Sequence, residues 1–195
     1  MPIRFAPEPQ NGSALVRAGL ERLTGRDNHL KLTREGLAGV AADSPHAVYD
    51  LRADEIAAGG GLDKAHASGV RYLVRAGGTA TAAAEVQTDA NGAASLLANI
   101  NSGPYVQATA EAFEALRAHE ALAKATYEVR LLRFSAIYLV ALWLKPERGP
   151  DLVYPLAPAP PELQAGRTYN AEEFLEAIRP AARRRAERVE PRRVP

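Results

Sequence analysis

The longest apolar run of the chain, residues 136–144, places the strongest constraint on the fold. Its sequence, AIYLVALWL, has no alternation of polar and apolar residues, which is typical of a strand buried on both faces. Its aromatic and β-branched residues favour a strand, while a buried helix over 136–145 or one bent strand that includes the residues before Ser135 stays open. We expect the rest of the chain to wrap around this segment without leaving a reactive pocket.

Alternating or β-rich segments predict further strands. These lie at residues 46–51, 70–75, 79–87, 95–100, 127–131 and 151–156. Gly77 and Gly78 stand between two of them, and two residues that tolerate positive φ suit a tight hairpin. Pro155 places the last strand at an edge of the sheet, because proline cannot donate a ladder hydrogen bond.

Helices are predicted where apolar residues recur at helical spacing. They run from Ser13 to Gly25, Thr33 to about Ala42, Asp54 to Gly59, Ser102 to about Ala123 and Asn170 to Ile178. The last has the clearest start, because Asn170 and Glu173 form a capping box and Tyr169 can pack on Phe174 as a hydrophobic staple. Pro180 is expected to kink or end this helix.

The order of these elements predicts an α+β fold. Strands follow one another without crossover helices, so the sheet should be largely antiparallel, in the order helix, second helix, strand, three-stranded meander, helix, three strands, helix. A chain of 195 residues can bury a sufficient core without metal or disulfide support. We predict a single α+β domain over residues 1–178, followed by a basic C-terminal helix end or tail over 179–195.

Composition excludes several functional classes. The chain has no cysteine, which rules out disulfides, thiolate catalysis and cysteine-ligated metal centres. Its four histidines show no metal-binding spacing, and the run Gly59-Gly60-Gly61 lacks the other residues of a phosphate-binding loop. We therefore expect no metal and no cofactor. The N-terminal sequence has no signal-peptide pattern and no apolar run is long enough to cross a bilayer, which predicts a soluble, cytoplasmic protein that does not contact membranes.

Glu85 and His46 are the candidate catalytic residues. Glu85 is the one acidic residue in the alanine-rich strand 79–87. Facing inward, it would be a buried carboxylate with a raised pKa and a candidate general base. The flanking pattern favours an outward position, since Ala84 and Val86 share the opposite face. His46 stands at a strand start, where a surface or capping role fits better than that of a base.

The C-terminal arginines are the candidate contacts for a partner. Residues 179–193 contain seven arginines and two glutamates, whereas the rest of the chain is net negative. Arg183, Arg184, Arg185 and Arg188 could bind an anionic partner or nucleic-acid phosphates. The alternative is a solvated helix end, where cations are favoured by the helix dipole.

Three functions follow from these observations. The leading hypothesis is a non-enzymatic interaction or assembly protein that self-associates, because no catalytic constellation is visible and a partner or second copy could cover part of the run 136–144. The second is a small hydrolase or transferase that uses Glu85 with His46 or a tyrosine. The third is a nucleic-acid accessory protein that acts through the C-terminal arginines.

Overall fold

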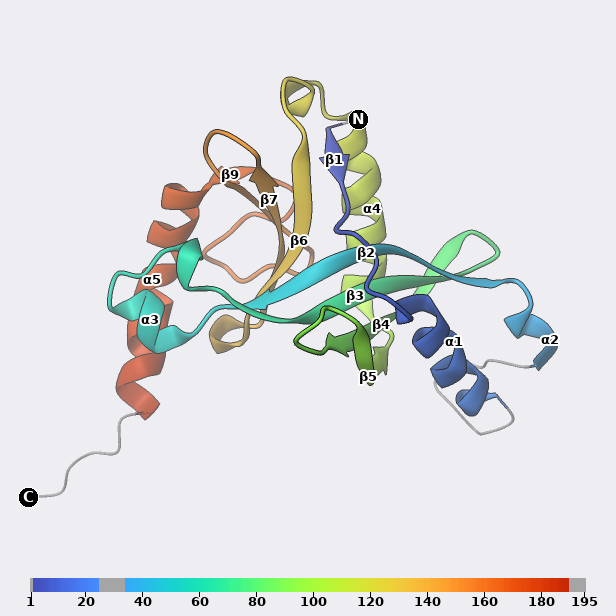
Figure 1. Ribbon diagram of the computed structural model, residues 1–195. Helices are drawn as coiled ribbons and strands as arrows, with labels where there is room; N and C mark the ends of the chain where they lie inside the picture. The colour runs from blue at the N-terminus through green and yellow to red at the C-terminus, as the bar shows by residue number, and fades with distance from the viewer. Residues whose placement is uncertain (1, 25–33, 190–195) are drawn as a thin grey trace, which may run out of the picture.

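The computed structural model describes residues 2–24 and 34–189 and shows one large sheet (Figure 1). Its strands are β1 (Ile3–Arg4), β2 (Val40–Asp50), β3 (His66–Ala76), β4 (Thr79–Thr88), β5 (Ala94–Asn101), β6 (Tyr127–Phe134), β7 (Leu139–Pro146), β8 (Leu152–Pro155) and β9 (Tyr169–Asn170). They lie in the order β5-β4-β3-β2-β6-β7-β8-β9, with β1 also paired to β6. Only the pairs β1–β6 and β2–β6 are parallel among the described strands. The predicted α+β fold is confirmed.

Helices cover both faces of the sheet. They are α1 (Gly12–Leu23), α2 (Arg34–Leu37), α3 (Ala53–Ala57), α4 (Pro104–Ala118) and α5 (Ala171–Val189), with the short turns η1 (Leu62–Lys64), η2 (Glu120–Leu122) and η3 (Ser135–Ile137). α4 packs on one face, where Phe113 and Leu116 join Leu73 and Leu131 in a buried cluster. The opposite face is covered at its two ends, by α1 over β3 and β4 and by α5 with α3 over β6 and β7 (Figure 1). No helix in the described ranges is long and apolar enough to span a bilayer.

The apolar run 136–144 forms most of β7, which lies between β6 and β8 as an interior strand. Leu142 and Leu144 pack on the α4 side, whereas Ala141 and Trp143 pack on the α5 side. The strand prediction is therefore confirmed, and both covers come from the same chain. A hairpin through η3 joins β6 to β7, with Tyr138 in the left-handed region at φ 55°, so neither the helix nor the single bent strand is present.

Several predicted boundaries near the N-terminus are wrong. β2 begins at Val40 and not at His46, and the helix expected over 33–42 is reduced to the four residues of α2. β2 passes through Ser44-Pro45 because its register against β3 shifts between Asp43 and His46. A bulge of this kind accommodates a proline without the loss of a ladder hydrogen bond. α1 begins after Asn11 rather than at Ser13, and the expected stop at Gly25 lies outside the described residues.

α5 begins as predicted and ends later than predicted. The Asn170 side-chain oxygen accepts a hydrogen bond of 2.8 Å from the Glu173 backbone N–H, which confirms the N-cap. The helix continues through Pro180 to Val189, so Pro180 does not end it. Ala181 is buried beside η3 and Ala182 is buried in the core cluster under α5, and this packing extends the helix past the proline. The basic segment therefore starts as part of a packed helix.

Candidate functional site

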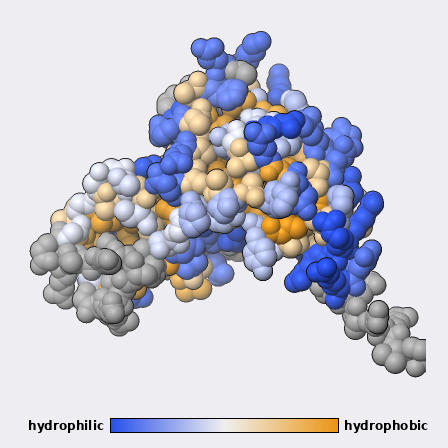
Figure 2. Space-filling view, turned by 180° about the vertical axis from the view of Figure 1, so that it is seen from behind, coloured by the Kyte–Doolittle hydropathy of each residue, from blue (hydrophilic) through white to orange (hydrophobic). Residues whose placement is uncertain are grey.

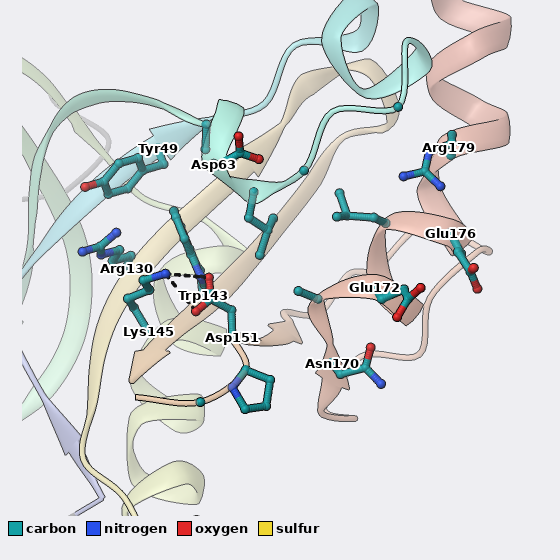
Figure 3. A pocket seen from close by; sticks show the side chains of 18 residues that line it. Tyr49, Asp63, Arg130, Trp143, Lys145, Asp151, Asn170, Glu172, Glu176 and Arg179 are labelled. Carbon is teal, nitrogen blue, oxygen red and sulfur yellow. Dashed lines mark hydrogen bonds and ion pairs between the residues drawn. The ribbon is translucent and has the colours of Figure 1, made fainter. Parts of the chain in front are cut away.

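A wide cleft of about 1070 Å³ opens beside the first half of α5 (Figure 3). We call it the α5 cleft. One wall is Asn170 with α5 as far as Arg179, and the opposite wall is the loop around η1, from Gly59 to Ala65. The sheet supplies the floor through Tyr49, Arg130 and Trp143, together with Lys145 and Asp151. No pocket lined by ionisable side chains was expected beside the run 136–144. The cleft could not be predicted from the sequence, because its walls come from three distant segments.

The floor of the cleft is a stack of aromatic rings and cations. The ring of Tyr49 meets that of Trp143 edge to face, with the centroids 5.2 Å apart. The Arg130 guanidinium lies 5.0 Å from the centroid of Tyr49 and 4.8 Å from that of Trp143. Arg130 is opposite Trp143 across the β6–β7 ladder, which explains their contact. Cations over aromatic faces are attracted to the ring quadrupole.

Asp151 fixes the edge of this floor. Its Oδ2 atom accepts two hydrogen bonds, one of 3.0 Å from the Trp143 indole N–H and one of 3.1 Å from the Lys145 ammonium group. The Arg130 Nε donates a hydrogen bond of 2.7 Å to Glu128 at the other side. These bonds hold the floor in one arrangement before anything binds, which lowers the entropic cost of binding.

The α5 wall carries a row of four charged side chains, two glutamates followed by two arginines. Glu172, Glu176, Arg179 and Arg183 follow each other at spacings of four, three and four residues and therefore lie on one side of the helix, which we call the α5 stripe. The first three line the cleft (Figure 3). Their side chains, and that of Arg183, make no hydrogen bond or ion pair to any residue in the described part of the chain.

A second group of charges, the polar cluster, lies on the opposite face of the sheet, beneath the start of α4. Arg71 donates a hydrogen bond of 2.6 Å to Glu85, and Arg133 donates one of 3.0 Å to the same carboxylate. Arg133 also donates to Asp50 through two bonds, of 2.8 and 3.0 Å. Asp50, Arg71, Glu85 and Arg133 thus link β2, β3, β4 and β6 in one network.

Burial and pairing shift the pKa values in this cluster in opposite directions. Burial alone would raise the pKa of Asp50, but hydrogen bonds from Arg133 and Ser68 bring it below its ordinary value. Burial lowers the pKa of Arg71, and the neighbouring Glu85 opposes that change. For Arg133, burial would lower the pKa, but the hydrogen bonds and charges of Asp50 and Glu85 together outweigh burial and raise it. All three groups are therefore charged at neutral pH.

Glu85 faces inward, so the outward position favoured from the sequence is wrong. Ala84 and Val86 do share the opposite face, where they pack under α1. The face of Glu85 is also covered, since it lies beneath Arg71 and Arg133, and the side chain is only 13% exposed. The two-residue periodicity of the strand correctly placed Glu85 on the face opposite to Ala84 and Val86. It could not show that both faces of β4 are buried.

His46 is fully buried and therefore not a surface residue. Its Nδ1 lies 2.6 Å from the Ser44 carbonyl oxygen, and its ring packs edge to face on Phe113 of α4. Burial lowers the pKa of His46 to about 4, so the ring is neutral at pH 7. The register places Arg71 between His46 and Glu85, and Glu85 pairs with arginines. The structure does not bring the two candidate catalytic residues into contact.

The C-terminal arginines divide between two sides of α5. Arg184, Arg185 and Arg188 line a groove of about 320 Å³ against η3, next to Tyr138, which is 86% exposed. Arg184 also donates a hydrogen bond of 3.2 Å to Glu162. Arg183 lies on the α5 stripe instead. Hydrophilic residues gather over this end of α5 (Figure 2).

Arg71 and Arg133 are the residues that the sequence analysis missed. Each arginine is two positions away from a buried leucine of its own strand, Arg71 from Leu73 and Arg133 from Leu131. Side chains two positions apart point to the same face of a strand, so each arginine points to the face of that leucine. That spacing is the signal by which they could have been found. The described residues contain no cluster of three or more histidine or acidic side chains that could hold a metal ion.

The chain resembles no characterised protein closely enough to carry over a function. No protein-family model, no curated protein and no solved structure matches it. Its function therefore has to be argued from the geometry of the α5 cleft and the polar cluster.

Proposed function

We propose that the protein is a non-catalytic interaction protein that self-associates as a symmetric dimer through α5. The observation that supports this is the order of charges on the α5 stripe. From the N-terminal end it reads Glu172, Glu176, Arg179, Arg183, two negative charges followed by two positive ones. Read in the opposite direction the signs are exchanged, so the stripe is complementary to an antiparallel copy of itself.

A two-fold axis matches all four charges at once. Consider an antiparallel pair that places Glu172 beside Arg183 of the second copy. The midpoint between residues 172 and 183 is also the midpoint between residues 176 and 179, so Glu176 then lies beside Arg179 of the second copy. The reverse contacts are identical by symmetry. Most soluble homo-oligomers use such an interface, in which the same patch serves both subunits.

The cleft supplies apolar surface that the dimer needs in addition to its ion pairs. An exposed ion pair contributes only about 0.2–1 kcal/mol, so four of them do not make a stable dimer by themselves. The stripe borders a cleft whose lining includes the partly exposed Tyr49, Ala65 and Ala171 and the exposed Pro150. Side chains of the second helix that enter this cleft would bury this area, and Arg130 and Arg179 in the lining are of a residue type that often dominates interfaces.

The reason for self-association differs from the one that the sequence suggested. The run 136–144 was expected to need cover on both faces, part of which a partner or second copy could have supplied. α4 and α5 of the same chain cover β7 on both faces, so a second copy is not needed there. The proposal now depends on the charges of the α5 stripe, which have no partner within residues 2–24 and 34–189 and are complementary to a second copy.

Charge reversal with mixing tests the proposal. Sedimentation velocity should show a dimer of the wild-type chain at tens of micromolar in about 50 mM salt, weakened in about 500 mM salt where the Debye length is only a few ångströms. Glu172→Arg with Glu176→Arg makes the stripe uniformly positive, and Arg179→Glu with Arg183→Glu makes it uniformly negative. Each double variant should be monomeric, and an equimolar mixture of the two should form the heterodimer.

A control keeps the charge change but moves it away from α5. Glu111→Arg with Glu114→Arg alters two exposed glutamates of α4, at a spacing similar to that in the stripe. This variant should dimerise like the wild type. A wild-type chain that stays monomeric at low salt would refute the proposal, and so would a mixture of the two α5 variants that does not associate.

A second candidate function is contact with nucleic-acid phosphates through Arg184, Arg185 and Arg188. The groove that these arginines line is favoured by its neighbour Tyr138, whose ring is exposed. Cations beside an exposed aromatic ring are the usual elements of single-strand binding. This groove is on another side of α5 than the stripe, so the two functions can be tested separately.

A further inference from the structure

A small pocket of about 240 Å³ lies between the start of α4 and the sheet, on the face opposite to α5. We call it the α4 pocket. Its charged lining consists of Arg71 and Arg133, and no carboxylate from the described residues lines it. The remaining walls come from Val106, Leu131 and Val140, together with the backbone that leads into α4. The lining therefore carries two guanidinium groups, whose charges are balanced by Glu85 and Asp50 from outside the lining.

The carboxylates of the polar cluster hold these arginines in place from outside the lining. Asp50 binds Arg133 through two hydrogen bonds, and Glu85 binds both guanidinium groups. Arg71 is additionally fixed by a bond of 3.1 Å from its Nη2 to the Asn101 side-chain oxygen. The positive groups are thus oriented before any ligand enters. Arg133 would act on an anion through its charge, because its N–H groups already donate to Asp50, Glu85 and Ser68, so charge-assisted hydrogen bonds would come from Arg71.

Arg71 retains unused capacity to donate. Its side chain is only 8% exposed and lines the pocket, and its Nε is buried without a hydrogen-bond partner in the described structure. A buried donor that lacks a partner costs free energy, and a small rearrangement of the side chain would let an anion in the pocket supply that partner. This observation is independent of the helix beside it.

The first turn of α4 adds a second positive feature. Residues Ser102 to Val106 line the pocket, and α4 is fifteen residues long, so the positive end of its dipole points there. The first turn contains no acidic residue, and no side chain among the described residues caps it. Gly103, at φ 134°, has open space where a Cβ would stand, which leaves the backbone accessible.

From these three features we propose that the α4 pocket binds a small oxyanion between Arg71, Arg133 and the first turn of α4. The chemical class is phosphate, or the phosphate or carboxylate group of a small metabolite. Pockets for drug-sized ligands are about 300–1,000 Å³, and the α4 pocket is smaller, which restricts the ligand to one such group with a short extension. The proposal is independent of the dimer, because the pocket and α5 lie on opposite faces.

Titration with inorganic phosphate tests this site directly. Backbone amide resonances of Gly103 and Tyr105 should shift and saturate as phosphate is added at constant ionic strength, and calorimetry should fit one site per chain. Acetate and sulfate, titrated in the same way, separate carboxylate from tetrahedral oxyanion recognition. The absence of a saturable shift at these amides with all three anions would overturn the proposal.

One substitution removes binding without disturbing the polar cluster. Ser102 is exposed at the helix start, and Ser102→Asp places a carboxylate there, where it competes with the anion and is favoured by the helix dipole. We expect phosphate to bind at least about tenfold more weakly to this variant, while the fold is retained. Ser95→Asp makes the same change at an exposed position of β5 and should bind phosphate like the wild type. Equal binding by all three proteins would overturn the assignment.

Discussion

Arg133 of β6 and Asp50 of β2 are directly opposite each other and share two hydrogen bonds, from Nε to one carboxylate oxygen at 2.8 Å and from Nη2 to the other at 3.0 Å. This pair closes the parallel seam at which the meander β2–β5 meets the hairpins β6–β9. The seam has a short ladder, from Val48 to Asp50 on one side. The ion pair is therefore a principal link between the two halves of the sheet.

Loss of this pair should weaken the whole domain. Asp50→Asn keeps the shape of the side chain but removes the charge and turns one acceptor into a donor that faces Arg133. We expect a loss of about 1–2 kcal/mol in the free energy of unfolding, less than for a fully buried pair because both side chains are about one-third exposed. Urea denaturation measures it. Asp89→Asn, at the exposed β4–β5 turn, tests whether any aspartate removal has the same effect.

His46 should make the protein sensitive to mild acid. Its pKa is lowered by burial from 6.5 to about 4, so between these values the unfolded chain binds a proton that the folded chain does not. Stability therefore increases with pH across this interval, and acidification from about pH 6.5 to 4 should cost about 3 kcal/mol. Asp50, whose folded pKa lies below its unfolded value, adds a further loss only as the pH falls below about 4.

Urea denaturation at a series of pH values separates the two contributions. In His46→Gln the loss between pH 6.5 and 4 should largely disappear, although the variant is less stable at neutral pH because Phe113 loses a ring contact. His119→Gln removes an exposed histidine and should keep the wild-type pH dependence. If His46→Gln keeps the full acid sensitivity, titration of His46 is not its cause.

Local patterns in the sequence predicted those parts of the fold that depend on neighbouring residues. The N-cap at Asn170, the hairpin at Gly77 and Gly78, and the buried strand ending near Leu144 all arise within a few positions of the chain. The other half of the predicted capping box is not formed, because the Glu173 carboxylate pairs with Arg167. β2 was misplaced because Pro45 suggested a boundary, whereas its place beside β3 is set by cross-strand pairing through a bulge. At Ser44-Pro45, pairing with β3 therefore outweighed the tendency of proline to end a strand.

The sites were harder to predict because their residues are distant in sequence. Glu85 and Arg133 are separated by 48 positions, and Asp50 and Arg133 by 83. Strand alternation can place each side chain on a face, but it does not show which strands are neighbours or whether both faces are covered. β6 pairs with β2 in parallel, and no turn sequence joins the two strands that would indicate this pairing. The polar cluster depends on it.

Trp143 reports on the integrity of the α5 cleft because it is the single tryptophan of the chain and is 4% exposed. Arg130 covers its ring, so Arg130→Ala should increase acrylamide quenching of the fluorescence and lower the free energy of unfolding by about 1–2 kcal/mol. Arg148→Ala, at an exposed arginine after β7, should change neither quantity. Unchanged quenching in Arg130→Ala would show that the guanidinium does not shield the ring.

The arginine groove should bind nucleic acid only if Arg184, Arg185 and Arg188 act together. Removal of the chain from residue 181 onward is unsuitable as a test, because Ala181 and Ala182 are buried and their loss would destabilise α5. Replacement of the three arginines by glutamine keeps this packing. We expect wild-type protein to retain single-stranded DNA at about 50 mM salt and the triple variant to lose it, with the slope of log affinity against log salt smaller by about 0.7 for each phosphate contact removed.

A matched variant separates this groove from the overall charge of the protein. Replacement of Arg17, Arg22 and Arg148 by glutamine removes the same charge from exposed positions outside α5. If both triple variants lose DNA to the same extent, the attraction comes from net charge, and if the wild type does not retain DNA, the groove has no such role. Loss confined to the α5 variant would assign the contact to the groove, because Tyr138 and the three arginines are the groups that line it together.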